Sequence, residues 1–237
     1  MTPWNLEVTE LLVRTAHGDH QAGLLEPCLR SIADRQIYAA YHYHEYKKLI
    51  HENIDSKIAG RHLLELILDP NEINRGDFYA TQKHIAANVI ACAQNLHCVA
   101  DTLAHAAYYA SAINLSPTKL VERAINLSAV SKALIQIPRF VQIAKLLAEL
   151  VANINFKYLT ALVNHSKHRS VIRPRLFVDT DSSIEKPYAL RFEEFKYDSN
   201  IYAAREVDSF LQPFYSWSSI HIVATGNTIN EALKNDV

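Results

Sequence analysis

The sequence predicts a mainly α-helical protein: a multi-helix, up-and-down bundle with a small antiparallel β-hairpin between the last core helix and a C-terminal helix. Only 5 glycines occur in 237 residues, whereas a chain rich in sheet needs many turns, and turns favour glycine. Apolar residues recur at spacings of three and four over most of the chain, which is typical of helices. After Pro174 the apolar spacing changes to two, which indicates strands.

The helical pattern predicts the following order of elements. Residues 1–20 show little periodicity, so we expect them to be partly irregular. Asp77 and Ser116 are the expected N-caps of two helices, because their side-chain oxygens can accept the free N–H groups of a first turn. Pro138 is expected to end or kink a helix. The predicted helices span residues 21–53, 77–113, 117–137, 139–169 and 206–234, with a short apolar segment at 57–69.

The hairpin is predicted from residues 175–178 and 189–195, which alternate apolar and polar side chains around a polar loop at 179–186. A third short strand is expected at residues 201–203. No linker-like stretch separates the hairpin from the helices. We therefore predict a single helical domain over residues 1–237, with the hairpin as an insertion at 170–204.

Cysteine usage and the start of the chain bear on the class of protein. The three cysteines, Cys28, Cys92 and Cys98, include no CxxC pair and do not form a disulfide framework. The first residues have neither the basic start nor the apolar core of a signal peptide. The most apolar helix contains too many polar side chains for a bilayer span. We therefore expect a cytoplasmic protein that uses no membrane, metal ion or cofactor.

Charge is unevenly distributed along the chain, although the net charge is only −1. Residues 1–122 hold 10 Lys/Arg and 14 Asp/Glu, residues 123–178 hold 9 and 1, and residues 179–237 hold 5 and 10. The middle segment is therefore strongly basic, with 9 minus 1 giving +8. Such a segment can face an external anion, the acidic parts of its own chain, or those of a second subunit.

The candidate site lies at the centre of this basic segment, where the predicted helix 139–169 ends. At 100° per residue, Asn164, Lys167 and His168 lie on one face of the helix. Arginine can bind phosphate through two parallel hydrogen bonds, lysine supplies a point charge, and histidine can exchange a proton near neutral pH. We assign His168 as acid or base, Lys167 and Arg169 as charge stabilisers, and Asn164 as the orienting residue. The predicted substrate-binding residues are His165, Arg173 and Arg175.

The same cations have a second explanation. Lys167, His168 and Arg169 can compensate the negative end of the helix dipole and cap its last carbonyl groups. However, no Asp or Glu occurs between residues 150 and 178, so these cations have no carboxylate partner nearby in the sequence. This absence favours an external anion or an anion on a second subunit.

A second constellation consists of His97, Asp101 and His105, spaced i, i+4 and i+8 on the long alanine-rich helix. A carboxylate beside a histidine can fix its tautomer. Eight residues span about 12 Å of helix axis, too far for one metal ion to bind all three. We therefore favour a buried polar network over a metal site built from one pair and ligands from elsewhere.

The run Asn-x-x-Lys-His-Arg at residues 164–169, followed by the hairpin, resembles uncharacterised bacterial proteins of the HEPN superfamily. The stretch at residues 95–101 resembles the same group. The resemblance implies a helical bundle that often dimerises, with paired sites at the dimer interface and an association with RNA or nucleotides. Nuclease members carry an arginine followed by a histidine after four to six residues in a late helix. Here that spacing occurs at Arg14–His20 and Arg35–His42, and not within residues 139–169.

Three hypotheses follow. The first is a cytoplasmic, HEPN-like homodimer that binds RNA or nucleotide phosphate through residues 164–169, with a metal-independent ribonuclease as its catalytic form. The alternative is a non-enzymatic dimeric interaction or scaffold protein, in which the basic segment pairs with acidic surface on a partner subunit. The third is a metal-dependent enzyme centred on His97 and Asp101.

Overall fold

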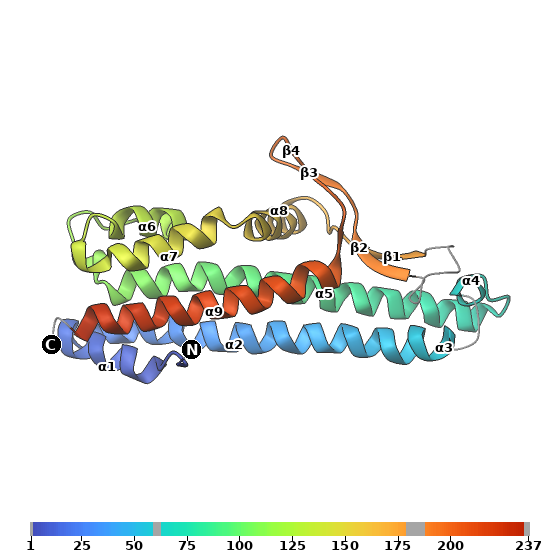
Figure 1. Ribbon diagram of the computed structural model, residues 1–237, viewed down its shortest axis with the longest axis horizontal. Helices are drawn as coiled ribbons and strands as arrows, with labels where there is room; N and C mark the ends of the chain where they lie inside the picture. The colour runs from blue at the N-terminus through green and yellow to red at the C-terminus, as the bar shows by residue number, and fades with distance from the viewer. Residues whose placement is uncertain (1, 59–62, 179–187, 235–237) are drawn as a thin grey trace. The chain divides into compact units, whose positions relative to one another are not determined.

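The computed structural model describes residues 2–58, 63–178 and 188–234. It is mainly helical with a small set of antiparallel strands before the last helix (Figure 1), so the predicted fold class is confirmed. The longer helices are α1 (Leu6–His17), α2 (Asp19–Ile50), α5 (Glu72–Ala110), α6 (Leu127–Leu134), α7 (Val141–Ala152), α8 (Ile154–His168) and α9 (Val207–Lys234). The short ones are α3 (Ser56–Ile58) and α4 (Leu63–Ile67).

Helix α1 corrects the expectation that residues 1–20 are irregular. The side chain of Asn5 caps α1, because its Oδ1 accepts a hydrogen bond from the Val8 N–H at 3.0 Å. Thr9 and Val13 are the buried residues of this helix. Because α1 buries so few residues, its sequence shows little apolar periodicity. The capping side chain of Asn5 is the feature of the sequence that indicates this helix.

Two helices begin at asparagines rather than at the predicted caps. Asn71 Oδ1 accepts a hydrogen bond from the Ile73 N–H at 2.9 Å, and α5 therefore begins before Asp77, which lies within it. Asn126 Oδ1 accepts a hydrogen bond from the Ala129 N–H at 3.0 Å. Helix α6 therefore begins at Leu127, well after the predicted cap Ser116. Both asparagines provide the side-chain acceptor that an N-cap needs.

The predicted helix 139–169 is two helices. Asn153 has an extended backbone, with ψ 127°, and separates α7 from α8. Its Oδ1 accepts hydrogen bonds from the N–H groups of Asn155 at 2.9 Å and Phe156 at 3.1 Å. The asparagine therefore ends one helix and caps the next. The apolar spacing continues across the break, which explains why the pattern alone predicts one helix.

The chain folds as two compact units. Unit 1 comprises Met1–Gln36, Leu96–Lys157 and Phe214–Val237, and unit 2 comprises Ile37–Asn95 and Tyr158–Pro213. Unit 1 has its own core, whose largest fully buried side chains include Tyr108, Phe140 and Phe214. Unit 2 likewise buries Tyr46 and Phe192. The single domain over 1–237 stays a prediction.

The strands all belong to unit 2. They are β1 (Pro174–Val178), β2 (Tyr188–Phe192), β3 (Phe195–Tyr197), β4 (Asn200–Tyr202) and β5 (Arg205–Glu206). Strands β1, β2 and β5 form one antiparallel sheet in that order, and β3 pairs with β4. The predicted strand 189–195 is therefore interrupted after Phe192, and Phe195 begins a second hairpin. The predicted loop at 179–186 lies outside the described residues.

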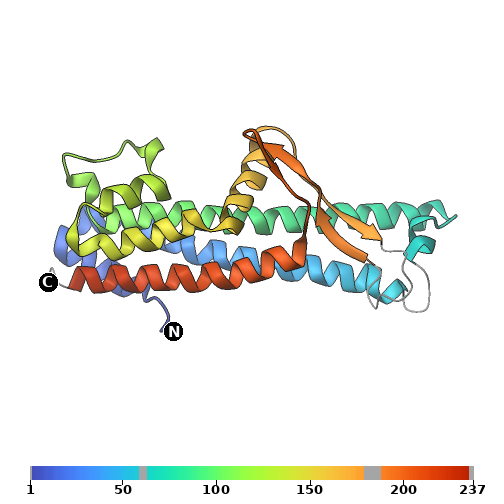
Figure 2. The ribbon, with the colours of Figure 1, turned by 45° about the horizontal axis from the view of Figure 1, so that its top comes forward.

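The β3–β4 hairpin turns at Asp198 and Ser199, which both have positive φ angles of 45° and 66°. Two consecutive left-handed residues match a type I′ turn, whose twist suits a two-residue hairpin. The hairpin lies beside α8 in both ribbon views (Figures 1 and 2). This placement decides which side chains at the end of α8 remain accessible.

Within residues 2–58, 63–178 and 188–234, no single helix is both long and apolar enough to cross a membrane. The segments Pro138–Ala152 and Ile154–His168 reach such a length and composition only when they are taken together across the break between them.

Candidate cationic site at the end of helix α8

The C-terminal turn of α8 presents Asn164, Lys167 and His168 on one face, as their spacing of three and four predicts. Lys167 and His168 are exposed, and Asn164 is half-buried. In the described part of the chain, neither Lys167 nor His168 makes an ion pair with a carboxylate. These two side chains are therefore accessible to an external ligand.

His165 has a different role, because its ring closes the end of α8. Its Nδ1 lies 2.8 Å from the Ser170 carbonyl oxygen, and since a carbonyl only accepts, Nδ1 carries the proton. The N–H groups of Arg169 and Ser170 both donate to the His165 carbonyl, at 2.9 and 3.2 Å. The ring also packs edge-on against Phe195 of β3, with centroids 5.9 Å apart. His165 is thus a capping residue of this helix.

Arg169 turns toward the β3–β4 hairpin. Its Nη2 lies 3.8 Å from Asp198 Oδ1, and its guanidinium carbon lies 5.2 Å from the centre of the Tyr197 ring. Both Arg169 and Asp198 are more than half exposed, so the pair contributes little to stability. It does hold the guanidinium over the hairpin, where an incoming anion competes with Asp198.

Arg173 and Arg175, one just before β1 and one within it, have different surroundings. Arg175 lies 3.1 Å from Glu193 Oε1 in an exposed ion pair. Arg173 precedes the strand and lines a pocket of about 440 Å³ against α5. The predicted site residues therefore have different surroundings. Lys167 and His168 are exposed, whereas His165 and Arg169 contact the β3–β4 hairpin. Arg175 pairs with Glu193, and Arg173 lines the pocket.

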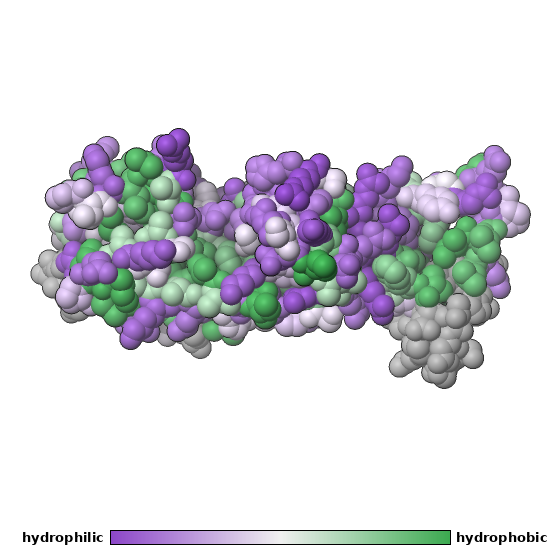
Figure 3. All heavy atoms as spheres, turned by 90° about the horizontal axis from the view of Figure 1, so that it is seen from above, coloured by the Kyte–Doolittle hydropathy of each residue, from purple (hydrophilic) through white to green (hydrophobic). Residues whose placement is uncertain are grey.

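The electrostatics of the α8 terminus are dominated by the side chains. A helix C-terminus carries roughly half a negative charge. The Lys167 ammonium alone exceeds this, so the turn remains positive after the dipole is compensated. In the space-filling view, hydrophilic side chains predominate where α8 and the β3–β4 hairpin lie, with hydrophobic side chains among them (Figure 3). The exposed Lys167 and Arg169 give this polar surface its positive charge.

The second constellation is only partly assembled. His97 is buried, and its Nδ1 lies 3.4 Å from Asp101 Oδ2. Its ring stacks on Phe156, with centroids 5.9 Å apart. His105 instead contacts the Tyr109 ring at 6.3 Å. Among residues 2–58, 63–178 and 188–234, no group of three or more His, Cys, Asp or Glu side chains is arranged to hold a metal ion.

A partly buried polar network in unit 2 has no counterpart in the sequence predictions. Asp208, in the first turn of α9, accepts hydrogen bonds from the Tyr46 hydroxyl and, at 2.6 Å, from Lys47 Nζ. Burial and the hydrogen bond to Asp208 raise the pKa of the Tyr46 hydroxyl far above its usual range. Burial lowers the pKa of Lys47, but the hydrogen bond to Asp208 and the negative charge of Asp208 together outweigh it, so the net shift of the pKa is upward. The feature of the sequence that could have indicated this network is the acidic residue Asp208 in the first turn of the last helix.

This network joins α2 to the beginning of α9 rather than forming an open site. The hydroxyl of Tyr43 donates to Gln212 at 3.3 Å, one turn beyond Asp208. The Tyr188 hydroxyl of β2 likewise donates to Asp55. With Tyr46 neutral and Lys47 charged, each donor has an acceptor, so the network holds these elements together.

Comparisons with family models, with curated proteins and with solved structures found no match.

Proposed function

We propose that this is a HEPN-like protein that binds the phosphate groups of RNA or of a nucleotide through Asn164, Lys167, His168 and Arg169. The observation that carries the proposal is the accessible pair Lys167 and His168, which face solvent side by side and have no ion-pair partner among the described residues. The surrounding segment is strongly basic, with 9 Lys/Arg and 1 Asp/Glu over residues 123–178. Lysine supplies the charge, and phosphate oxygens accept hydrogen bonds from both side chains.

The chemistry available at this turn is limited to binding and proton transfer. Asn164 lies one helical turn before Lys167 and His168 on the same face, where its amide can orient a bound group. Arg169 adds a guanidinium that can exchange Asp198 for a phosphate oxygen. If the bound strand is cleaved, His168 is the proton donor or acceptor for a 2′-hydroxyl or a leaving oxygen.

The test is the affinity of the full-length protein for a short single-stranded RNA, measured by fluorescence anisotropy at low salt. We expect the Lys167→Ala/His168→Ala variant to bind at least about tenfold more weakly, a loss of about 1.4 kcal/mol. The matched control is Lys132→Ala/His20→Ala, which removes the same side-chain types from other exposed positions and should bind as the wild type does. Equal affinities for the two variants would contradict the proposal.

The catalytic form is tested separately in the same preparation. His168→Gln should abolish cleavage of the RNA while leaving binding within a few-fold of the wild type, because the glutamine amide can still donate a hydrogen bond to a phosphate oxygen but cannot transfer a proton. Retained cleavage in His168→Gln with chelator present would exclude His168 as the acid or base.

A second function is favoured by one specific observation, the pairing of Arg169 with Asp198 and of Arg175 with Glu193. Basic residues of this segment are thus complementary to acidic hairpin residues of the same sequence, and an acidic surface on a second subunit can offer the same contacts. In that case the protein is a non-enzymatic dimeric scaffold. Absence of RNA binding at low salt, together with dissociation of a dimer by Lys167→Ala/Arg169→Ala, would support this reading over the first.

A further inference from the structure

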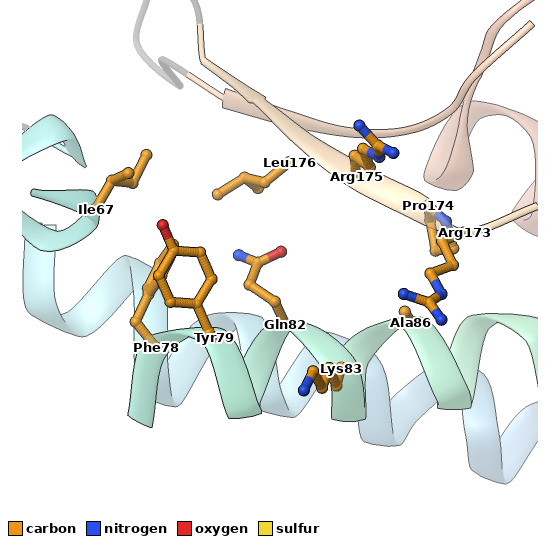
Figure 4. A pocket seen from close by; sticks show the side chains of 10 residues that line it. All are labelled: Ile67, Phe78, Tyr79, Gln82, Lys83, Ala86, Arg173, Pro174, Arg175 and Leu176. Atoms are coloured by element: carbon orange, nitrogen blue, oxygen red, sulfur yellow. The ribbon is translucent and has the colours of Figure 1, made fainter. Parts of the chain in front are cut away.

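A pocket of about 440 Å³ lies within unit 2, between the start of α5, α4 and strand β1 (Figure 4). This volume falls in the range of about 300–1,000 Å³ that small-molecule sites occupy. Its wall includes Arg173, which the sequence predicted to bind substrate, but not Lys167 or His168. The pocket is therefore distinct from the cationic site at the end of α8.

One end of the pocket is apolar. Ile67 of α4, Phe78 of α5 and Leu176 of β1 line it, and Figure 4 shows their side chains grouped at the same end. Leu176 faces α5 because it alternates with Arg175, whose guanidinium lies on the other side of the strand (Figure 4). In the space-filling view, hydrophobic side chains also gather over β1 and α4 (Figure 3). This end suits a hydrocarbon or aromatic group.

The opposite end carries hydrogen-bond donors. The Arg173 guanidinium lies beside Ala86, two turns of α5 beyond Phe78 (Figure 4). The Gln82 side chain stands between the two ends and points toward β1 (Figure 4). Its Nε2 atom is buried and makes no hydrogen bond in the described structure, and a buried donor without an acceptor costs about 1–3 kcal/mol. In Figure 4 this nitrogen lies on the side of Tyr79 and the amide oxygen on the side of Arg173, so Gln82 adds a polar group to the middle of the pocket.

The charge at this end is also uncompensated. Within the described residues, neither Arg173 nor Lys83, which also lines the pocket, has an ion-pair partner. Arg175 differs, since Glu193 pairs with it. The planar guanidinium of Arg173 can donate two parallel hydrogen bonds to the two oxygens of a carboxylate, whose single charge it matches. From Phe78 to Ala86 the pocket follows about 12 Å of helix axis, so the apolar and cationic ends are separated by the length of a medium-chain molecule.

We propose that this pocket binds an amphipathic carboxylate, with its apolar chain against Ile67, Phe78 and Leu176 and its carboxylate against Arg173. Burial of the chain supplies most of the binding energy at roughly 25 cal/mol per Å². Arg173 determines the orientation of the ligand and the preference for an anionic head. The inference does not depend on RNA binding, because Lys167 and His168 take no part in it.

The probe is decanoate, whose extended length is comparable to the distance between the two ends, titrated into the full-length protein by isothermal calorimetry. We expect saturable binding of one decanoate per chain. Decanol, which lacks the charge, and butyrate, which lacks the chain, should each bind at least about tenfold more weakly. Arg173→Gln should weaken decanoate to a similar extent. Arg123→Gln, an exposed arginine in unit 1, should bind as the wild type does.

Three results would overturn the inference. The first is the absence of decanoate binding up to about 1 mM, which means a binding free energy weaker than about 4 kcal/mol. The second is decanol binding as tightly as decanoate, and the third is unchanged decanoate affinity in Arg173→Gln. Decyl phosphate binding more than about tenfold tighter than decanoate would overturn the assignment of the head group to a carboxylate. Lys167→Ala/His168→Ala should leave decanoate binding unchanged, so failure of this site and failure of the RNA site are separable.

Discussion

His165 and Lys167 are two residues apart on α8, yet they face different surroundings. The His165 ring bonds to the Ser170 carbonyl and packs on Phe195, whereas Lys167 is exposed. The sequence correctly groups Asn164, Lys167 and His168 on one face, because helical spacing is a local property. It does not predict that the His165 ring packs on Phe195, because that contact depends on a hairpin about thirty residues later in the chain.

Tyr158 provides a prediction at the residue scale. Its side chain is buried and its hydroxyl has no hydrogen-bond partner in the described structure. An unsatisfied buried hydroxyl costs about 1–3 kcal/mol. Tyr158→Phe should therefore raise the free energy of unfolding by about 1 kcal/mol at neutral pH, measured by urea denaturation. The Arg205 guanidinium, 4.3 Å from the ring centre, can stay over a phenyl ring.

The pH dependence of this variant has a defined sign. Burial raises the pKa of the Tyr158 hydroxyl to about 12, against the opposing effect of Arg205. A folded-state pKa above the unfolded value of about 10 means that the wild type loses stability as pH rises from about 10 to 12. The advantage of Tyr158→Phe should therefore grow over that interval. Tyr38→Phe, at a half-exposed position, should change stability little, and a destabilised Tyr158→Phe at neutral pH would contradict the account.

At the scale of single elements, asparagines define several helix boundaries. Asn5, Asn71, Asn126 and Asn153 each accept hydrogen bonds from the following backbone N–H groups. Apolar periodicity identified the bodies of the long helices but placed Asp77 and Ser116 at their starts. The pattern is insensitive to ends because one capping side chain adds no apolar residue to it. The break at Asn153 is hidden for the same reason.

Two glycines give opposite predictions within unit 1. A Cβ built at Gly226 of α9 would lie 1.8 Å from Trp4 Cδ2, whereas nothing lies within 4 Å of a Cβ at Gly23 of α2. Gly226→Ala must displace the Trp4 ring, whose Nε1–H donates to Thr9 Oγ1 at 2.7 Å. We expect it to lower the free energy of unfolding by about 1–3 kcal/mol.

Gly23→Ala is the matched control, since it makes the same change in an open part of a helix. It should raise the free energy of unfolding by about 0.5–1 kcal/mol, because alanine loses less backbone entropy than glycine in a helix. Thermal and urea denaturation of both variants measure the difference. Equal effects of the two substitutions would show that Trp4 does not pack on Gly226 in solution.

For the whole molecule, composition was the informative quantity. Glycine poverty and long apolar stripes predicted the helical class, and the change of period after Pro174 predicted the strands. The division into two units was not predictable from pattern, because α2, α5, α8 and α9 each contribute residues to both. The uneven distribution of charge is visible in the sequence, but the acidic partners of the basic residues are not. Asp198 and Glu193 meet Arg169 and Arg175 only once the hairpins form.

The pocket beside α5 belongs to the same scale. Its wall combines α4 and the start of α5 with β1, which follows them by about a hundred residues in the chain. The sequence indicates Arg173 as a binding residue because it is basic. The structure shows that it lines one pocket together with Gln82 and several apolar side chains. Sequence periodicity carries no information on such a long-range combination.

The most direct test of the phosphate-binding proposal is the salt dependence of RNA affinity. For single-stranded nucleic acid, the logarithm of the association constant falls with the logarithm of salt concentration by about 0.7 per phosphate contacted. Lys167→Ala should therefore make the slope shallower by about 0.7, while Lys132→Ala, from the same basic segment, should keep the wild-type slope. An unchanged slope in Lys167→Ala, or an equal loss in both variants, would contradict the account.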